Sequence, residues 1–176
     1  MASLRLSGKH CKLRALEPSD LDFLYRLEND VDIWEISNTV QPYSKNILER
    51  YLQHAHLDIY QAKQLRLCIC NNENECLGLV DLFDFDPKNL RAGVGVIVAD
   101  AAMRNQGFAT EALQLVLEYA YDILGLHQIY ANILEDNFSS IALFEKLGFE
   151  KVGTKVDWVF WRGTFKNELL YQKIKS

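Results

Sequence analysis

Proline and glycine are scarce in this sequence: 176 residues contain 3 Pro and 9 Gly, with no internal repeat or low-complexity segment. Hydrophobic residues make up 49% of the chain. This composition excludes a disordered chain and a collagen-like fibre, which have either little apolar content or much Pro and Gly. A chain of this length buries roughly 70% of its unfolded surface, so it can form a core without a disulfide or a metal. We expect one folded domain over residues 1–176.

An excess of basic residues is also absent. The 19 Lys and Arg against 24 Asp and Glu give a net charge of −5, which argues against nucleic acid or a membrane surface as a partner. Met1–His10 lacks the apolar core of a signal peptide. The apolar run Ala92–Ala99 is far shorter than the roughly 20 residues that cross a bilayer. We expect a cytoplasmic protein, and its acidity leaves a small cationic partner open.

The cysteines lack the spacing of a metal site. No C-x-x-C pair of the zinc-binding type occurs among Cys11, Cys68, Cys70 and Cys76. Cys68 and Cys70 lie two residues apart in an apolar run, so they point to the same face of a strand and cannot easily bridge each other. We therefore expect buried thiols and no metal.

Apolar periodicity predicts helices between short strands. One helix follows Pro18, with Ser19 as N-cap. Its apolar stripe is Leu21, Leu24, Leu27 and Val31. Ser44 caps a second helix, and we expect the segment 34–43 before it to be irregular. The inward residues of the second helix are Ile47, Leu48, Tyr51, Leu52 and Ala55.

Later in the chain, a strong helix begins near Thr110 and stops before Gly125, and a short one ends at Gly148. The predicted strands are 13–16, 65–70, 76–85, 92–98, 129–133, 149–160 and 169–174. Polar turns between neighbouring strands indicate hairpins, and helices between others indicate crossovers. The order predicts a mixed α/β fold whose sheet is partly antiparallel and covered by helices.

The segment 94–112 carries the strongest functional signal, a strand and a helix joined by the loop Arg104-x-x-Gly107-x-Ala109. Small residues at 107 and 109 let the backbone approach a ligand, and the free N–H groups of a helix start can bind a phosphate. A tight turn that uses Gly107 only for its geometry explains the same residues, so both interpretations stay open at this point. A Walker-type phosphate loop is absent.

This loop resembles the R/Q-x-x-G-x-G/A motif of the GNAT superfamily of acyl-CoA N-acyltransferases. The segment Asn137–Phe149 resembles a second motif of that superfamily, N-x-x-[SA]-x-x-L-Y-x-x-x-G-F, at the expected distance. The likeness extends over nearly the whole chain. It is strongest to the branch that holds spermidine and ribosomal-protein N-terminal acetyltransferases.

The resemblance implies a largely antiparallel sheet of six or seven strands, splayed at a cofactor wedge and covered by helices on both faces. In such a fold the backbone of Val96, Ile97 and Val98 pairs with the pantetheine arm of acetyl-CoA. The pyrophosphate lies on the loop and helix start formed by Arg104, Asn105, Gln106, Gly107, Phe108, Ala109 and Thr110. Asn137 reaches the pantetheine, and Ser140 and Phe144 line its far side, although Phe144 also fits plain helix packing.

Two positions depart from the family pattern. Phe144 stands where relatives commonly carry a tyrosine that protonates the leaving thiolate, and Gly93 stands where many have a glutamate base. Asp81 is our candidate base, because alternation places it with Leu77, Leu79, Phe83 and Phe85 on an apolar face, where burial would raise its pKa. The pattern alone favours a simpler explanation of Asp81, a capped or edge-facing aspartate that is satisfied by backbone groups.

Other residues could shape the acceptor side. Glu35, Asp84 and Asp86 could form an acidic mouth that attracts amines, although charged loops are usually only solvated. Three tryptophans could line the acceptor cleft or pack in the core: Trp34, Trp158 and Trp161.

The resemblance implies an enzyme that moves acetyl from acetyl-CoA, as co-substrate, to a primary amine by direct attack in a ternary complex. The acceptor could be a polyamine, a protein N-terminus or another small amine, and the acidic charge favours a polyamine. A homo-oligomer is possible. The substitutions at Gly93 and Phe144 suggest the alternative, a CoA-binding module without transferase activity.

Overall fold

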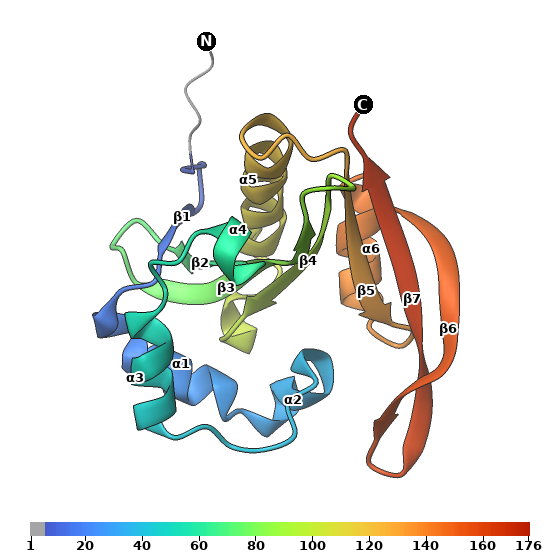
Figure 1. The fold of residues 1–176 in the computed structure, drawn as a ribbon. Coiled ribbons are helices and arrows are strands. Elements are labelled where there is room, and N and C mark those ends of the chain that lie inside the picture. The colour runs from blue at the N-terminus through green and yellow to red at the C-terminus, as the bar shows by residue number, and fades with distance from the viewer. Residues whose placement is uncertain (1–5) are drawn as a thin grey trace.

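The computed structural model describes residues 6–176, and its centre is a seven-stranded sheet in the order β1-β2-β3-β4-β5-β7-β6 (Figure 1). All neighbouring strands are antiparallel except β4 and β5, which are parallel. The strands are β1 (Lys12–Ala15), β2 (Leu65–Cys70), β3 (Cys76–Asp86), β4 (Arg91–Val98), β5 (Gln128–Leu134), β6 (Glu150–Trp161) and β7 (Thr164–Ile174). The mixed, largely antiparallel sheet predicted from the sequence is confirmed.

Helices cover both faces of this sheet. The helices are α1 (Leu21–Glu28), α2 (Val31–Ser37), α3 (Lys45–Gln53), α4 (Ile59–Ala62), α5 (Phe108–Asp122) and α6 (Phe138–Lys146), with short 3-10 turns at Pro18–Asp20 and Ala101–Met103. The larger core holds α5 with the inner residues of β2 to β5. A second core on the opposite face packs α1, α2 and α3 against β2 and β3. No helix among residues 6–176 is long and apolar enough to cross a membrane.

Local sequence chemistry fixes most helix starts. Side chains of Asp30, Ser44, Asp58 and Asn137 accept a backbone N–H at the starts of α2, α3, α4 and α6. Each bond satisfies one of the donors that a helix start leaves free. Helix α5 begins differently, because its N-cap is Gly107, which has no side chain to cap it.

The start of α1 corrects one prediction. Ser19 is not an N-cap; it lies inside the 3-10 turn Pro18–Asp20. Asp20 accepts the backbone N–H of Glu17 at 2.7 Å and both terminal nitrogens of Arg14 at 2.8 and 2.9 Å. The Asp20 carboxylate therefore closes the turn by binding both the Arg14 guanidinium and the Glu17 N–H. The sequence pattern of capping residues does not show the contact with Arg14.

The segment between the first two predicted helices also differs from the prediction. Residues 34–37 are not irregular, because Asp30 starts a new helix, α2, that continues to Ser37. Val31 opens α2 and is 51% exposed, so it is not part of the α1 stripe. In α3, Leu48 is buried as expected, whereas Ile47 is 49% exposed.

A bulge in β3 changes which side chains share a face. Asp84 has a positive φ of 47°, and the pairing register of β3 with β4 shifts between Phe83 and Asp86. Phe85 consequently packs in the larger core with Val80, and not on the face of Asp81 as simple alternation predicts.

Candidate active site

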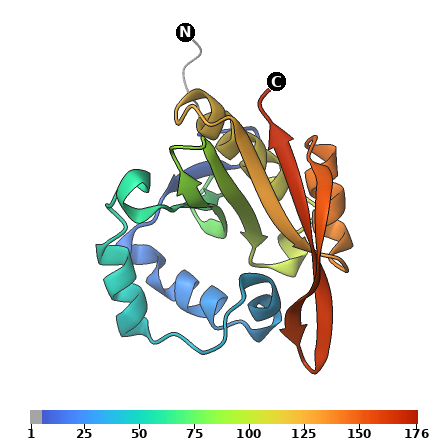
Figure 2. The ribbon, with the colours of Figure 1, turned by 45° about the vertical axis from the view of Figure 1, so that its right-hand side comes forward.

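The parallel strands β4 and β5 form an open wedge. They pair only between Arg91–Gly93 and Gln128–Tyr130, and beyond these residues no pairing joins them (Figure 2). The rest of β4, from Val94 onward, lines two neighbouring cavities that share some lining residues. The separation leaves backbone groups of β4 without a strand partner on that side, so they are free to pair with an extended ligand.

The first cavity, which we call the cofactor groove, has a volume of about 310 Å³. It lies between the end of β4, the loop before α5 and the start of α6. Eleven of the residues predicted to bind the cofactor line it: Val96, Ile97, Val98, Arg104, Asn105, Gly107, Phe108, Ala109, Thr110, Asn137 and Ser140. The structure therefore brings these eleven residues together around one cavity.

The start of α5 suits an anion. Gly107 has a φ of 88°, a conformation that L side chains rarely adopt, and it places the first N–H groups of the helix at the groove. No side chain caps them. Together with the helix dipole and the guanidinium of Arg104 in the same lining, they form a positive site in an acidic protein.

The loop before α5 is held by its own polar side chains. Asp100 accepts the N–H of Ala102 at 2.8 Å, and Gln106 donates to the carbonyl of Ala102 at 2.8 Å. Gln106 was predicted as a pyrophosphate ligand, but its side chain bonds within the loop and does not line the groove. Its visible contribution is to the shape of the loop.

Helix α2 supplies a wall of the groove that sequence reasoning missed. Asp32, Ile33 and Ile36 line the groove opposite the α5 loop. The acidic N-cap at Asp30, followed by the apolar residues Val31, Ile33 and Ile36, is the available signal, but the sequence prediction makes residues 34–43 irregular. Ile36 lies on both cavities, so α2 reaches the junction between them.

The second cavity, which we call the acceptor pocket, has a volume of about 180 Å³ and adjoins the groove, because Val96, Asn137 and Ser140 line both. Its polar lining comes from α2 and its C-cap, β5, the start of α6 and the β6–β7 hairpin: Glu35, Asn38, Asn132, Asn137, Ser140, Trp158 and Glu168. Glu35 and Trp158 were both considered for the acceptor side from the sequence, whereas Glu168 was not identified.

Ion pairs occupy both pocket carboxylates. Lys166 Nζ lies 2.5 Å from Glu35 Oε1 and 2.6 Å from Asp136 Oδ2. Lys155 Nζ lies 2.6 Å from Glu168 Oε1 and 3.1 Å from Asn132 Oδ1. A bulge in β6 between Lys155 and Val159 turns this part of the hairpin against the pocket.

Phe144 and Gly93, the two positions that depart from the family pattern, are both packed against phenylalanine rings. Phe144 is 4% exposed, lines the acceptor pocket and packs edge-on against Phe149, with ring centroids 5.0 Å apart. At Gly93, a Cβ would lie 2.3 Å from the ring of Phe83. Phe83 therefore fills the space into which a larger residue at 93 would project, and no side chain can be added there unless the ring moves.

Asp81 lies on β3 opposite Gly95, a residue of the pocket lining, but does not itself line the pocket. Its Oδ1 accepts from Arg66 Nε at 2.7 Å and its Oδ2 from Arg66 Nη2 at 3.2 Å. Arg66 also donates to Glu28 at 2.8 Å. The carboxylate is held by a cation from the neighbouring strand, so a proton transfer to it competes with this ion pair.

The remaining acidic and aromatic candidates lie away from the pocket. Asp84 accepts from Tyr130 OH at 3.4 Å, and Asp86 pairs with Arg91 at 3.2 Å, both at the closed end of the wedge. Trp34 donates its indole N–H to the carbonyl of Glu28, and Trp161 closes β6 at the hairpin turn. Of the acidic mouth, only Glu35 lies at the acceptor pocket.

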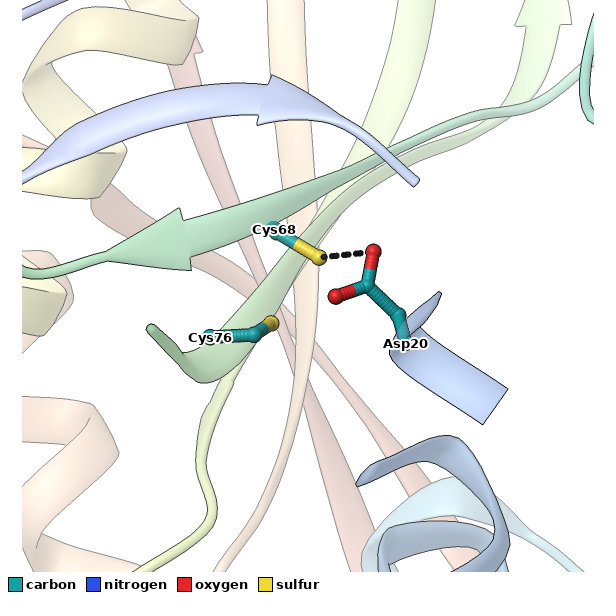
Figure 3. Close-up of side chains that lie close together, drawn as sticks. All are labelled: Asp20, Cys68 and Cys76. Atoms are coloured by element: carbon teal, nitrogen blue, oxygen red, sulfur yellow. Dashed lines mark hydrogen bonds between the residues drawn. The ribbon is translucent and has the colours of Figure 1, made fainter. Parts of the chain in front are cut away.

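Asp20, Cys68 and Cys76 form the only group of possible metal ligands among residues 6–176, with ligand atoms within 4.8 Å of one another (Figure 3). The hydrogen bond with Cys76 and burial raise the pKa of Cys68, which favours a thiol over the thiolate that binds metal. Burial raises the pKa of Asp20, but bonds from Arg14 and from the Glu17 N–H outweigh it and lower that pKa. This cluster is suited to stabilising the fold.

Comparison with known proteins identifies relatives of this chain. The family model described as an acetyltransferase (GNAT) domain matches residues 10–150. Spermidine N(1)-acetyltransferase of Vibrio cholerae is 29% identical over 157 residues, which cover 88% of this chain and 87% of that protein. The same-named protein of Escherichia coli K12 is 27% identical over 165 residues, with 93% and 85% covered.

Solved structures are similar over nearly the whole chain. Vibrio cholerae spermidine N-acetyltransferase in complex with CoA and spermine has a TM-score of 0.85 at 26% identity, covering 95% of this chain and 96% of that one. A dodecameric structure of that enzyme has a TM-score of 0.78 at 26% identity, with 95% of each chain covered. Its complex with manganese ions has a TM-score of 0.77 at 28% identity, with 94% and 92% covered.

The family model covers most of the chain, and the groove predicted from its motifs is present in the fold. The chain therefore belongs to the GNAT acetyltransferase family and is a CoA-dependent N-acetyltransferase that transfers acetyl from acetyl-CoA to an amine.

Proposed function

We propose that this chain acetylates a primary amine of a polyamine such as spermidine, as one acetyltransferase domain over residues 1–176. The observation that carries the proposal is the acceptor pocket, in which the carboxylates of Glu35 and Glu168 and the ring of Trp158 lie directly beyond the cofactor groove. Carboxylates and an aromatic face are the groups that bind alkylammonium ions. Full-length similarity to spermidine acetyltransferases supports the same substrate class.

The groove residues would divide the work of holding acetyl-CoA. The N–H groups at the start of α5 and the Arg104 guanidinium would bind the pyrophosphate. The unpaired edge of β4 at Val96, Ile97 and Val98 would bind the pantetheine arm and direct an N–H at the thioester oxygen, where negative charge develops. Asn137, with Ser140, would fix the arm on the α6 side, where Asn137 Oδ1 accepts the Ser140 N–H at 3.2 Å.

The reaction proposed is a direct attack of the amine nitrogen on the thioester carbonyl. The acceptor ammonium first gives one proton to a base. In the attack a C–N bond forms and the C–S bond breaks, the nitrogen loses a second proton and the departing sulfur takes one, so one proton is released overall. An alkylamine with a pKa near 10.4 is about one part in 10³ neutral at pH 7, which costs about 4 to 5 kcal/mol without a base. We propose Asp81 as that base. Phe144 has no proton to give, so solvent at the open groove would protonate the sulfur.

The setting of the reaction follows the same proposal. We propose a cytoplasmic homo-oligomer whose chemistry uses no metal and which has neither nucleic acid nor a membrane as a partner. A dodecameric relative supports the homo-oligomer. The net charge of −5 supports the absence of nucleic acid and membrane partners.

The test is thiol release from acetyl-CoA across a panel of amines: spermidine, spermine, 1-butylamine and a peptide with a free N-terminus. We expect release with both polyamines, a product that gains one acetyl group, and a lower kcat/KM for the peptide. Preference for the peptide would contradict the polyamine proposal. CoA binding without thiol release for any amine would instead support a CoA-binding module.

A further inference from the structure

Two lysines of the β6–β7 hairpin lie on the carboxylates of the acceptor pocket. Lys166 on β7 bridges Glu35 and Asp136, and Lys155 on β6 binds Glu168. The hairpin projects past the sheet toward α2, which carries Glu35 (Figures 1 and 2). Each ion pair therefore joins the hairpin to the lining of the pocket.

These lysines have the surroundings that a bound alkylammonium would need. Lys155 Nζ contacts a carboxylate and the amide oxygen of Asn132, and lies 5.1 Å from the centre of the Trp158 ring. Lys166 Nζ contacts two carboxylates. Hydrogen bonds with Asp136 and Glu35 raise the pKa of Lys166, so it stays an ammonium at neutral pH.

A lysine ammonium and the end of a polyamine are the same chemical group, a primary alkylammonium on a methylene chain. Glu35 and Glu168 line the pocket, whereas Asp136 lies outside the lining. Together the three carboxylates meet two ammonium groups, which leaves one excess negative charge around the pocket. The one excess negative charge attracts the ammonium of the reacting amine. Any further ammonium group of the same acceptor must compete with Lys155 or Lys166 for a carboxylate. The two side chains are 31% and 23% exposed, so they can move into solvent.

We propose that Lys155 and Lys166 determine acceptor specificity as tethered competitors. They do not line the pocket themselves, but each binds one of its two carboxylates and so reduces the advantage of acceptors with several ammonium groups. This inference rests on the proposed function, because it assigns the acceptor side of the same site. If the lysines only stabilised the fold, replacing them would not change the preference of the pocket for acceptors with several ammonium groups over acceptors with one.

The experiment compares spermidine with 1-butylamine, which lacks the distal ammonium groups, in Lys155→Met and Lys166→Met. The ratio of kcat/KM for spermidine to kcat/KM for butylamine should rise about five- to tenfold in each variant, the effect of freeing the one pocket carboxylate that each lysine binds. Lys45→Met is the matched control: it removes the same charge and the exposed ion pair with Asp22, a carboxylate that, unlike Glu35 and Glu168, lines neither cavity.

If a variant turns over too slowly for kinetics, a binding measurement tests the same inference. Binding of spermidine to the protein saturated with CoA should be tighter in both variants than in the wild type, and CoA affinity itself reports that the groove is folded. An unchanged or lower ratio in both variants, with unchanged spermidine binding, overturns the inference.

The failure of this inference and the failure of the proposed function give different results. Wild-type turnover of spermidine with no change of the ratio in the variants refutes only the role of the lysines. Absence of polyamine turnover in the wild type, with turnover gained in a lysine variant, refutes only the proposed substrate of the wild-type chain.

Discussion

At the scale of single residues, the partner of a carboxylate decides what chemistry it can do. Asp81 and the pocket carboxylates illustrate this, because all of them are paired with cations in the structure. Asp81 is joined to Arg66 by two hydrogen bonds, and Arg66 is shared with Glu28. A base at Asp81 must exchange part of this network for the proton of the amine.

Asp81→Asn tests that role. If Asp81 takes the proton, kcat falls about 100-fold or more, because general-base catalysis typically contributes 10²- to 10⁴-fold. The acidic limb of the pH–rate profile should disappear with it, while CoA affinity is retained. Steady-state kinetics across pH measure both effects.

Glu28→Gln is the matched control for this experiment. It disturbs the same Arg66 at the other carboxylate, with a bond of 2.8 Å, and leaves the candidate base in place. Equal losses of stability in the two variants with kcat preserved in Asp81→Asn would make Asp81 a support for Arg66. The base would then have to come from Glu35 or Glu168, which line the pocket.

The sequence predicted the groove better than the pocket for a physical reason. A phosphate-binding loop is a local feature, and the pattern from Arg104 to Ala109 contains most of it. Glu168 and Lys155 come together only through the pairing of β6 with β7, and Glu35 meets Lys166 from a distant helix. Such contacts depend on register and on bulges, which residue patterns do not specify.

At the scale of elements, the same distinction separates what was predicted from what was missed. The β2–β3 hairpin and α5 follow from continuous apolar patterns, and their positions were predicted within about two residues. Helix α2 has seven residues, of which only Ile33 is buried, so its pattern was too short to identify. It nevertheless supplies walls of both cavities.

Helix α5 is tied to the segment before β1 by one carboxylate. Glu111 accepts the backbone N–H groups of Lys9, His10 and Cys11, each at 2.7 Å. Burial raises the pKa of Glu111, but these three bonds outweigh it, and the resulting pKa lies below the ordinary value of 4.5. The contact stabilises the helix whose first turn lines the cofactor groove.

Glu111→Gln should lower the free energy of unfolding by about 1 to 2 kcal/mol at pH 7, since the site is partly exposed and Gln keeps one acceptor oxygen. Because the folded pKa is lowered, this stabilisation is complete above the unfolded value and is lost as the pH falls through the folded pKa. The difference in Tm between wild type and variant should therefore shrink below about pH 4.5.

Thermal melts from pH 3 to pH 7 measure this dependence. Glu118→Gln, an exposed position on the same helix whose side chain makes no hydrogen bond among residues 6–176, is the matched control and should leave Tm unchanged. A Tm difference for Glu111→Gln that stays constant with pH would contradict the role of the ionised carboxylate.

At the scale of the whole molecule, the cofactor groove beside the β4–β5 wedge depends on both hydrophobic cores. The larger core positions α5 and the second core positions α2, and the cofactor groove is lined by both helices. A ligand that fills this groove should therefore stabilise the folded chain as a unit. The positive start of α5 also explains how a chain with a net charge of −5 can bind an anion.

Acetyl-CoA at 100 times its Kd should add about 2.7 kcal/mol to the free energy of unfolding and raise Tm by roughly 5 to 10 °C. Gly107→Glu should abolish that shift, because it places a bulky anion at the proposed pyrophosphate site and a side chain at a φ of 88°. Gly163→Glu, at a φ of 85° in the β6–β7 turn with open space around it, adds similar strain and charge away from the groove and should keep the shift. Thermal denaturation with and without ligand measures all three proteins. A missing shift in the wild type, or the same loss in both glycine variants, would contradict the assignment of the α5 start as the anion site.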